Sequence, residues 1–141
     1  MAASNEFLVS RVFDEIINGG RVETADEILA PNYVNYSFPG VPPGPDGFKG
    51  VIGMFLTAFP DMKVHVDEMM TDGDRVTTRG RMTGTHQGEF MGIPATGKSV
   101  DIGYIDIWRA ENGKLVENWV EMDRLGMMQQ LGIVPSAEQG E

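Results

Sequence analysis

The feature that most constrains the fold is a hairpin signal near the C-terminus. Two runs of alternating residues, "VDIGYIDIW" and "LVENWVEMD", flank Asn112-Gly113. An Asn-Gly pair favours a two-residue turn between antiparallel strands. Pairing Glu111 with Lys114 sets the register of this predicted hairpin. One of its faces then carries four cross-strand pairs: Ile102–Asp123, Tyr104–Glu121, Asp106–Trp119 and Trp108–Glu117. Both faces are substantially apolar, so we expect the hairpin to be covered on both sides.

A second hairpin is predicted over residues 62–86, around the loop "DGD". Pairing Thr71 with Arg75 gathers the apolar residues on one face, whereas a two-residue loop would mix the faces. The polar face then pairs His65 with Arg81 and Asp67 with Arg79.

The N-terminal half reads as helices. Apolar residues at helical spacing predict a helix over 4–18 with Ser4 as its N-cap, and Thr24 with Glu27 forms a capping box for a short second helix. Residues 32–38 read as a short strand, a third helix is expected after Asp46, and a last one over 124–131.

This order of helices followed by strands predicts an α+β fold, with helices on one face of a curved sheet that encloses a cone-shaped cavity. We expect one domain over 1–134 and a disordered tail over 135–141.

Composition excludes several functions. Eleven basic against 21 acidic residues give a net charge of −10, which disfavours binding to nucleic acid or to anionic membranes. There is no cysteine, so thiolate and disulfide chemistry are absent, and no apolar run approaches a membrane span. We therefore expect a cytoplasmic protein. No nucleotide-binding loop or serine elbow occurs, so an enzyme of this sequence would work by proton transfer without a cofactor.

Asp123 is the strongest candidate for chemistry. In the predicted register it shares a face with Ile102, Tyr104 and Trp119, and such surroundings raise the pKa of a carboxyl group towards the range of acid–base catalysis. Glu121 lies on the same face and would raise that pKa further. The alternative is structural, because Asp123 directly precedes a helix and can be its N-cap.

Other candidates are weaker. His86 falls on the apolar face of its strand and can bind a carbonyl oxygen or serve as a structural residue. Tyr33 and Asn35 share a face of the first strand and can present a phenol and an amide to a ligand, or simply bond the strand edge. With two histidines and no cysteine, no metal-ligand spacing can be built.

Residues 58–132 resemble the SnoaL-like polyketide cyclases, within the nuclear-transport-factor-2-like superfamily. The resemblance rests on the segments "AFPD", "GTHQGEFMGIPATGK", "DIWRAENGKLVENW" and "DRLGMMQQLG" in the family's order. It implies an α+β cone, a homodimer or homotetramer, and intramolecular aldol condensation of a hydrophobic polyketide-like substrate without a cofactor. It also implies that Asp123 is the acid/base.

The resemblance assigns supporting roles as well. Tyr104 and Trp119 would shape the cavity, and His86, Asn35 and Tyr33 would hold substrate oxygens. Two alternatives stay open because the superfamily hosts many functions. One is another proton-transfer enzyme, such as a dehydratase, isomerase or epoxide hydrolase. The other is a non-catalytic module for small-molecule binding or dimerisation. Epoxide opening is disfavoured because the strand "RVTTRGRMT" has arginines but no suitably spaced aspartate.

Overall fold

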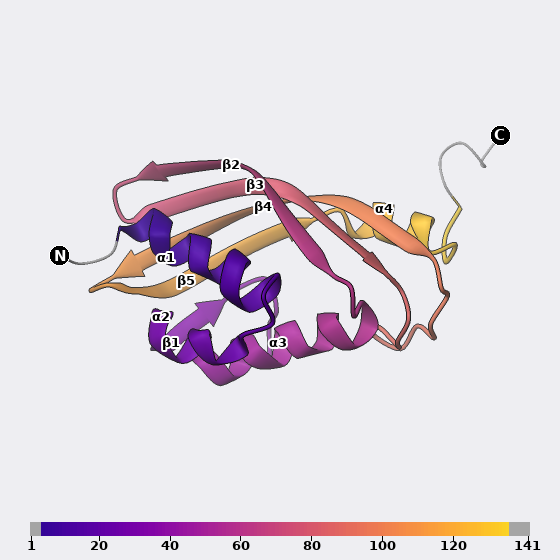
Figure 1. Cartoon of the computed structure of the whole chain (residues 1–141), viewed down its shortest axis with the longest axis horizontal. Helices are drawn as coiled ribbons and strands as arrows, with labels where there is room; N and C mark the ends of the chain where they lie inside the picture. Colours follow the sequence, from indigo (N-terminus) through magenta and orange to yellow (C-terminus); the bar gives the residue numbers. More distant parts are fainter. Residues whose placement is uncertain (1–3, 136–141) are drawn as a thin grey trace.

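The computed structural model describes residues 4–135, and helices precede most of the sheet along the chain (Figure 1). The elements are α1 (Asn5–Arg11), the π-helical η1 (Val12–Ile17), the 3-10 turn η2 (Val22–Thr24), α2 (Ala25–Ile28), β1 (Leu29–Asn35), α3 (Pro45–Ala58), β2 (Lys63–Asp72), β3 (Arg75–Thr85), β4 (Ser99–Glu111), β5 (Lys114–Met122) and α4 (Arg124–Gln130). The predicted α+β fold is confirmed. Of the predicted tail, 135–141, all but Pro135 lies outside the described residues.

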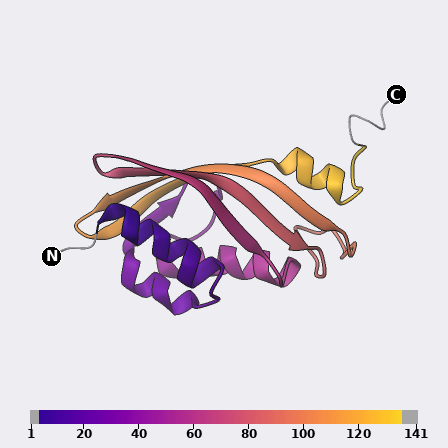
Figure 2. The same cartoon turned by 45° about the horizontal axis from the view of Figure 1, so that its top comes forward.

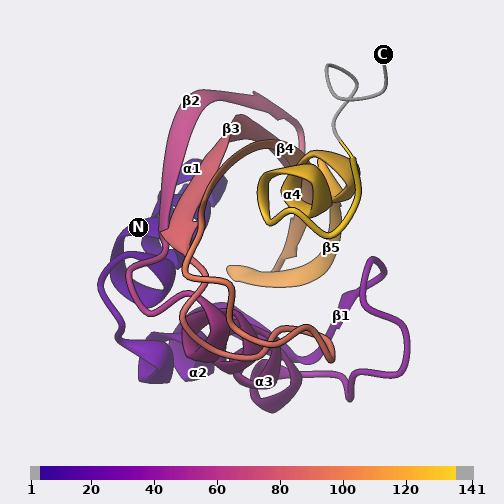
Figure 3. The same ribbon diagram turned by 90° about the vertical axis from the view of Figure 1, so that its right-hand side faces the viewer.

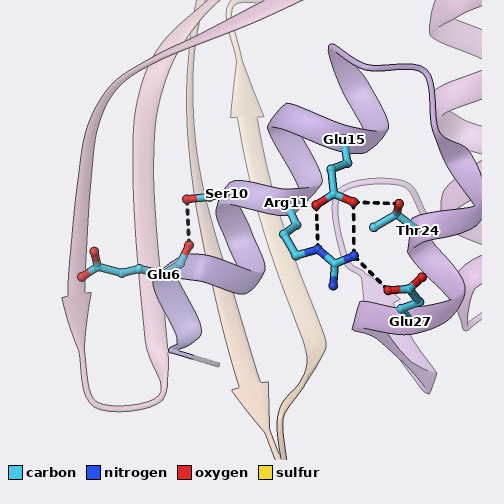
Figure 4. Close-up of polar contacts among 6 residues, drawn as sticks. All are labelled: Glu6, Ser10, Arg11, Glu15, Thr24 and Glu27. Atoms are coloured by element: carbon cyan, nitrogen blue, oxygen red, sulfur yellow. Dashed lines mark hydrogen bonds and ion pairs between the residues drawn. The ribbon is translucent and has the colours of Figure 1, made fainter. Parts of the chain in front are cut away.

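The first helical segment begins as predicted. The Ser4 hydroxyl accepts the Phe7 N–H at 3.1 Å, which satisfies one of the free donors of the first turn. The predicted capping box at Thr24 is wrong, because the Thr24 side chain makes no cap bond and donates to Glu15 at 3.1 Å instead. That bond belongs to a polar cluster in which Arg11 reaches Glu15 at 2.7 Å and Glu27 at 2.8 Å (Figure 4). Arg11 thereby fixes the first helix against α2.

The sheet has five strands in the order β1-β5-β4-β3-β2. Neighbours are antiparallel except for the edge pair β1 and β5, which run parallel. The strands curve strongly, and α1, α2 and α3 lie on the concave side, as the rotated view and the end view show (Figures 2 and 3). The apolar core fills the space between these helices and the sheet. Within residues 4–135, no helix is long and apolar enough to cross a membrane.

The β2–β3 hairpin has a different turn from the predicted one. Asp72 pairs with Arg75 across a two-residue turn, so the predicted pairing of Thr71 with Arg75 is wrong. A bulge at Asp67 then shifts the register, and His65 faces Arg81 as predicted, while Glu68 instead of Asp67 faces Arg79. The bulge restores the separation of faces that a two-residue turn alone would have lost.

A bulge also changes the β4–β5 hairpin, with larger consequences. The turn is as predicted, because Glu111 pairs with Lys114, but an extra residue, Val116, makes Arg109 pair with Glu117. From there every β5 residue is shifted by one relative to the prediction, which exchanges the faces of β5. Tyr104 therefore faces Met122, Asp106 faces Val120, and Trp108 faces Asn118.

Candidate active site

A cavity of about 90 Å³ lies between the concave face of the sheet and the helices. One water needs roughly 10–15 Å³ of such space, so the cavity can take several waters or the reacting part of a larger apolar ligand. The helices supply its apolar side with Phe13, Ile17, Phe48, Val51, Ile52 and Phe55. The polar groups come from the strands: Asn35 of β1, Tyr104 and Asp106 of β4, and Asn118 of β5.

Asp106 is the carboxyl group of this cavity. Its side chain is buried, with 4% of the residue exposed, because it points inward from the middle of β4. The Thr78 hydroxyl donates to its Oδ1 at 2.6 Å, and the Trp108 indole N–H donates to its Oδ2 at 3.0 Å. Burial raises the pKa of Asp106 to about 6, although these two hydrogen bonds favour the charged form and oppose the shift.

Tyr104 is connected to Asp106 through Thr78. The phenol oxygen of Tyr104 lies 3.0 Å from the Thr78 hydroxyl oxygen. Because Thr78 uses its hydrogen on Asp106, Tyr104 is the donor in this second bond. Burial raises the pKa of Tyr104 to about 12, so the phenol is protonated at neutral pH. The three side chains form one chain of hydrogen bonds in which every hydrogen points towards Asp106.

Two amides complete the polar wall. Asn118 accepts the Tyr33 hydroxyl at 3.3 Å and donates to the Ile107 carbonyl at 2.9 Å, so both ends of its side chain are held. Asn35 accepts the Ser37 backbone N–H at 2.9 Å through Oδ1. Asn35 lines the cavity, and its side chain also faces the Tyr33 hydroxyl. The amide of Asn35 therefore lies at the cavity wall beside the Tyr33 hydroxyl.

The family model of the SnoaL-like polyketide cyclases matches residues 7–131. The chain belongs to this family. Among curated relatives, the nogalonic acid methyl ester cyclase of Streptomyces nogalater is 26% identical over 119 residues, covering 82% of this chain and 88% of the relative. The aklanonic acid methyl ester cyclase DnrD of Streptomyces peucetius is 27% identical over 123 residues, covering 84% of each.

Solved structures agree with this SnoaL-like assignment. TsrD from Streptomyces laurentii is 30% identical and superposes with a TM-score of 0.85, covering 92% of this chain and 95% of that one. Wild-type IdmH from Streptomyces antibioticus is 32% identical with a TM-score of 0.79, covering 92% and 99%. The fold and the family are thus established together, and the named relatives indicate a cyclase-type enzyme.

In this SnoaL-like chain, Asp123 does not lie where the sequence placed it. The prediction that it faces the interior is wrong, because the bulge at Val116 turns Glu117, Trp119 and Glu121 to the outer side of the sheet. Asp123 is exposed and accepts the Gly126 backbone N–H at 2.8 Å, so the structural alternative, an N-cap of α4, is confirmed. Glu121, Trp119 and Asp123 line a hollow on the outer surface instead of the cavity.

Trp119 also packs away from the cavity. Its ring stacks on Tyr36, with centroids 5.2 Å apart, and the Arg75 guanidinium lies 5.1 Å from its centroid. The predicted set of site residues is therefore divided: Tyr104 and Asn35 line the cavity, whereas Tyr33 lies behind its wall, where it packs on Phe48 and Trp108 and donates to Asn118.

His86 is buried, but it is not among the residues that line the cavity. Its Nδ1 accepts the Thr96 backbone N–H at 3.2 Å and lies 3.0 Å from the Thr96 hydroxyl, and its ring packs on Phe59. These contacts hold the loop that follows β3. The structure thus places His86 in the structural role that the sequence left open, outside the lining of the cavity.

Sequence reasoning missed Asp106, Thr78 and Asn118 as site residues. The available signal was Asp106 itself, an acid between Ile105 and Ile107 within a strongly apolar strand. A charged residue in such a run is costly to bury unless it is hydrogen-bonded, which makes it informative. Within the described residues, no group of three or more His, Asp or Glu side chains is placed to hold a metal ion.

Proposed function

We propose that this protein catalyses a cofactor-independent intramolecular aldol condensation of a hydrophobic polyketide-like ester, with Asp106 as the acid/base. The observation that carries the proposal is a single carboxyl group, buried in an apolar cavity, whose pKa is raised to about 6. A base with a pKa near the working pH combines a useful ionised fraction with good proton affinity. The cyclase relatives support the reaction class.

The chemistry needs few groups. A methylene flanked by two carbonyls is already acidic, and its enolate is delocalised over them. Asp106 takes one proton from this carbon, and the enolate then attacks a second carbonyl of the same molecule to form the ring. The amide of Asn35, which lines the cavity, is placed to donate to the oxygen that gains negative charge, and the apolar helix wall keeps the chain folded for attack.

The cavity supports an aldol reaction better than epoxide opening. Epoxide opening as in the related epoxide hydrolases would require two aspartates and an arginine in the cavity. The lining residues include one carboxylate, Asp106, and no arginine. The predicted homodimer or homotetramer stays a prediction. The outer face of the sheet, which no helix covers within the described part of the chain, would be its natural interface (Figure 3).

The test uses aklanonic acid methyl ester and nogalonic acid methyl ester as probes. Ring closure is followed by chromatography with mass detection, which separates the product from its isomeric substrate. We expect turnover by the wild type and a loss of about 100-fold or more in Asp106→Asn, in line with the usual contribution of a general base. Asp101→Asn is the matched control, since Asp101 is on the same strand but exposed and paired with Arg81 at 2.8 Å.

Two results would contradict the proposal. Unchanged turnover in a folded Asp106→Asn variant would remove Asp106 from the reaction. Tight binding of both esters by the wild type without turnover would favour the non-catalytic binding module.

A further inference from the structure

The hydrogen-bond chain at the cavity holds more than one exchangeable proton. Tyr104, Thr78 and Asp106 are joined by contacts of 3.0 and 2.6 Å, and all three residues are at most 6% exposed. Thr78 is fully buried and does not line the cavity, so its hydroxyl meets these two partners and no substrate. A buried hydroxyl placed between two titratable groups can pass a proton from one to the other.

We infer that Tyr104 is the acid that protonates the new alkoxide, and that Thr78 is a positioning residue that returns a proton from Asp106 to Tyr104 after each turnover. This inference rests on the proposed function and divides its acid and base steps between two groups.

The proton balance closes as follows. Asp106 takes the proton of the substrate C–H bond and becomes a carboxylic acid, while the enolate carbon forms the new C–C bond. The carbonyl oxygen that is attacked becomes an alkoxide, which takes the phenol proton of Tyr104 and leaves a phenolate. Asp106 then gives its proton to the Thr78 oxygen as Thr78 gives its own hydrogen to the phenolate. Carboxylate, hydroxyl and phenol are all restored.

The hydrogen-bond directions fit this sequence. After the return step the Tyr104 hydrogen points to Thr78 and the Thr78 hydrogen points to Asp106, which is the arrangement found in the structure. The order of acidities supports it too, because the pKa of Tyr104, about 12, lies well above that of Asp106, about 6. Proton return from the carboxylic acid to the phenolate is therefore strongly downhill.

The first arm of the test uses the protein without substrate. The carboxyl titration of Asp106 is followed by carbon NMR in the wild type, Tyr104→Phe, Thr78→Val and the double variant. We expect Tyr104→Phe to raise the midpoint when Thr78 is present, because the Thr78 hydroxyl loses the donor that polarises it. In the Thr78→Val background, Tyr104→Phe should cause no shift of this midpoint. Equal shifts in both backgrounds would overturn the coupling.

The second arm measures turnover of the two methyl esters. We expect Thr78→Val to release a stoichiometric burst of product and then slow about 100-fold, because the stranded proton must return through water. Tyr104→Phe should slow the first turnover itself, and Thr78→Ser should restore steady turnover. Thr77→Val, which changes the neighbouring outward residue paired with Ile107, is the control for stability. Steady turnover without a burst in a folded Thr78→Val variant would overturn the relay.

The two arms separate the two proposals. Coupled titration without turnover of either ester would reject the aldol proposal for these substrates and retain only the coupling of Tyr104, Thr78 and Asp106. Turnover that depends on Asp106 but shows neither coupling nor burst would reject the relay and retain Asp106 as the sole acid/base.

Discussion

The indole N–H of Trp108 donates to Asp106 Oδ2 at 3.0 Å, which makes Trp108 a built-in reporter of the charge on Asp106. Trp108 is buried, with 2% exposed, and the other tryptophan of the chain, Trp119, lies on the outer face of the sheet.

We therefore predict that the fluorescence of Trp108, measured in a Trp119→Phe background, titrates with a midpoint near pH 6. Burial raises the pKa of Asp106 to about 6 from an ordinary 3.8, and ionisation of the bonded carboxyl changes the field at the indole. Asp106→Asn should abolish the transition, while Asp101→Asn should preserve it. A midpoint below pH 4, or a transition that survives in Asp106→Asn, would contradict this prediction.

The same pKa shift predicts how stability depends on pH. Asp106 binds its proton more tightly in the folded chain than in the unfolded chain, so its contribution is fully present below pH about 4 and is lost as the pH rises through about 6. A shift of about two pKa units corresponds to about 3 kcal/mol. Relative to Asp106→Asn, the wild type should lose about this much free energy of unfolding between pH 4 and pH 8.

Urea unfolding of both proteins at several pH values measures this difference. The comparison cancels the other titrating groups, which are common to both proteins. A difference that stays constant with pH would mean that Asp106 is ionised with an ordinary pKa.

Asp123 should behave as a helix cap. It accepts the Gly126 N–H at 2.8 Å, so Asp123→Ala should cost about 1 kcal/mol of stability. Asp123→Asn keeps a good capping side chain and should change the melting temperature little. Neither variant should lose turnover of the methyl esters when folded. Loss of turnover in Asp123→Asn with an unchanged melting temperature would return the acid/base role to Asp123.

The sequence was sufficient to predict the architecture, because the local signals for helix starts and turns are strong. Ser4 at a helix start and Asn112-Gly113 between two apolar runs each specify local geometry through one or two residues. The alternation of the strands and the helical spacing before them then predict the α+β layers. Tyr104 and Asn35 were expected at the cavity and do line it, although β1 covers Leu29–Asn35 instead of the predicted 32–38.

The sequence could not predict the whole site, because a bulge exchanges the two faces of β5 and leaves no strong local signal in the sequence. Leu115 and Val116 are both buried although they are consecutive, which is the mark of the bulge in the folded chain. In sequence they are merely two apolar residues in a strand that is apolar on both faces. Without that extra residue Asp123 would face inward, and with it Asn118 does so instead. Which face of β5 turns inward depends on which one packs better against Trp108 and α3, so tertiary contacts decide it.

Gly80 provides the last test, because it controls the position of Tyr104. A Cβ at Gly80 would lie 1.8 Å from the His65 carbonyl oxygen and 3.1 Å from Tyr104 Cε1. Gly80→Ala should therefore separate β2 from β3 locally and cost about 3 kcal/mol, at the upper end for an overpacked site.

Gly103→Ala is the matched control on the adjoining strand. The nearest atom to its Cβ would be the Gly80 carbonyl oxygen at 3.9 Å, so its free energy of unfolding should change by less than about 0.5 kcal/mol. We expect Gly80→Ala, but not Gly103→Ala, to raise the midpoint of the Asp106 titration, because a displaced Tyr104 no longer donates to Thr78. Equal stability of the two variants would show that β2 yields at the bulge and that Gly80 does not hold Tyr104 in place.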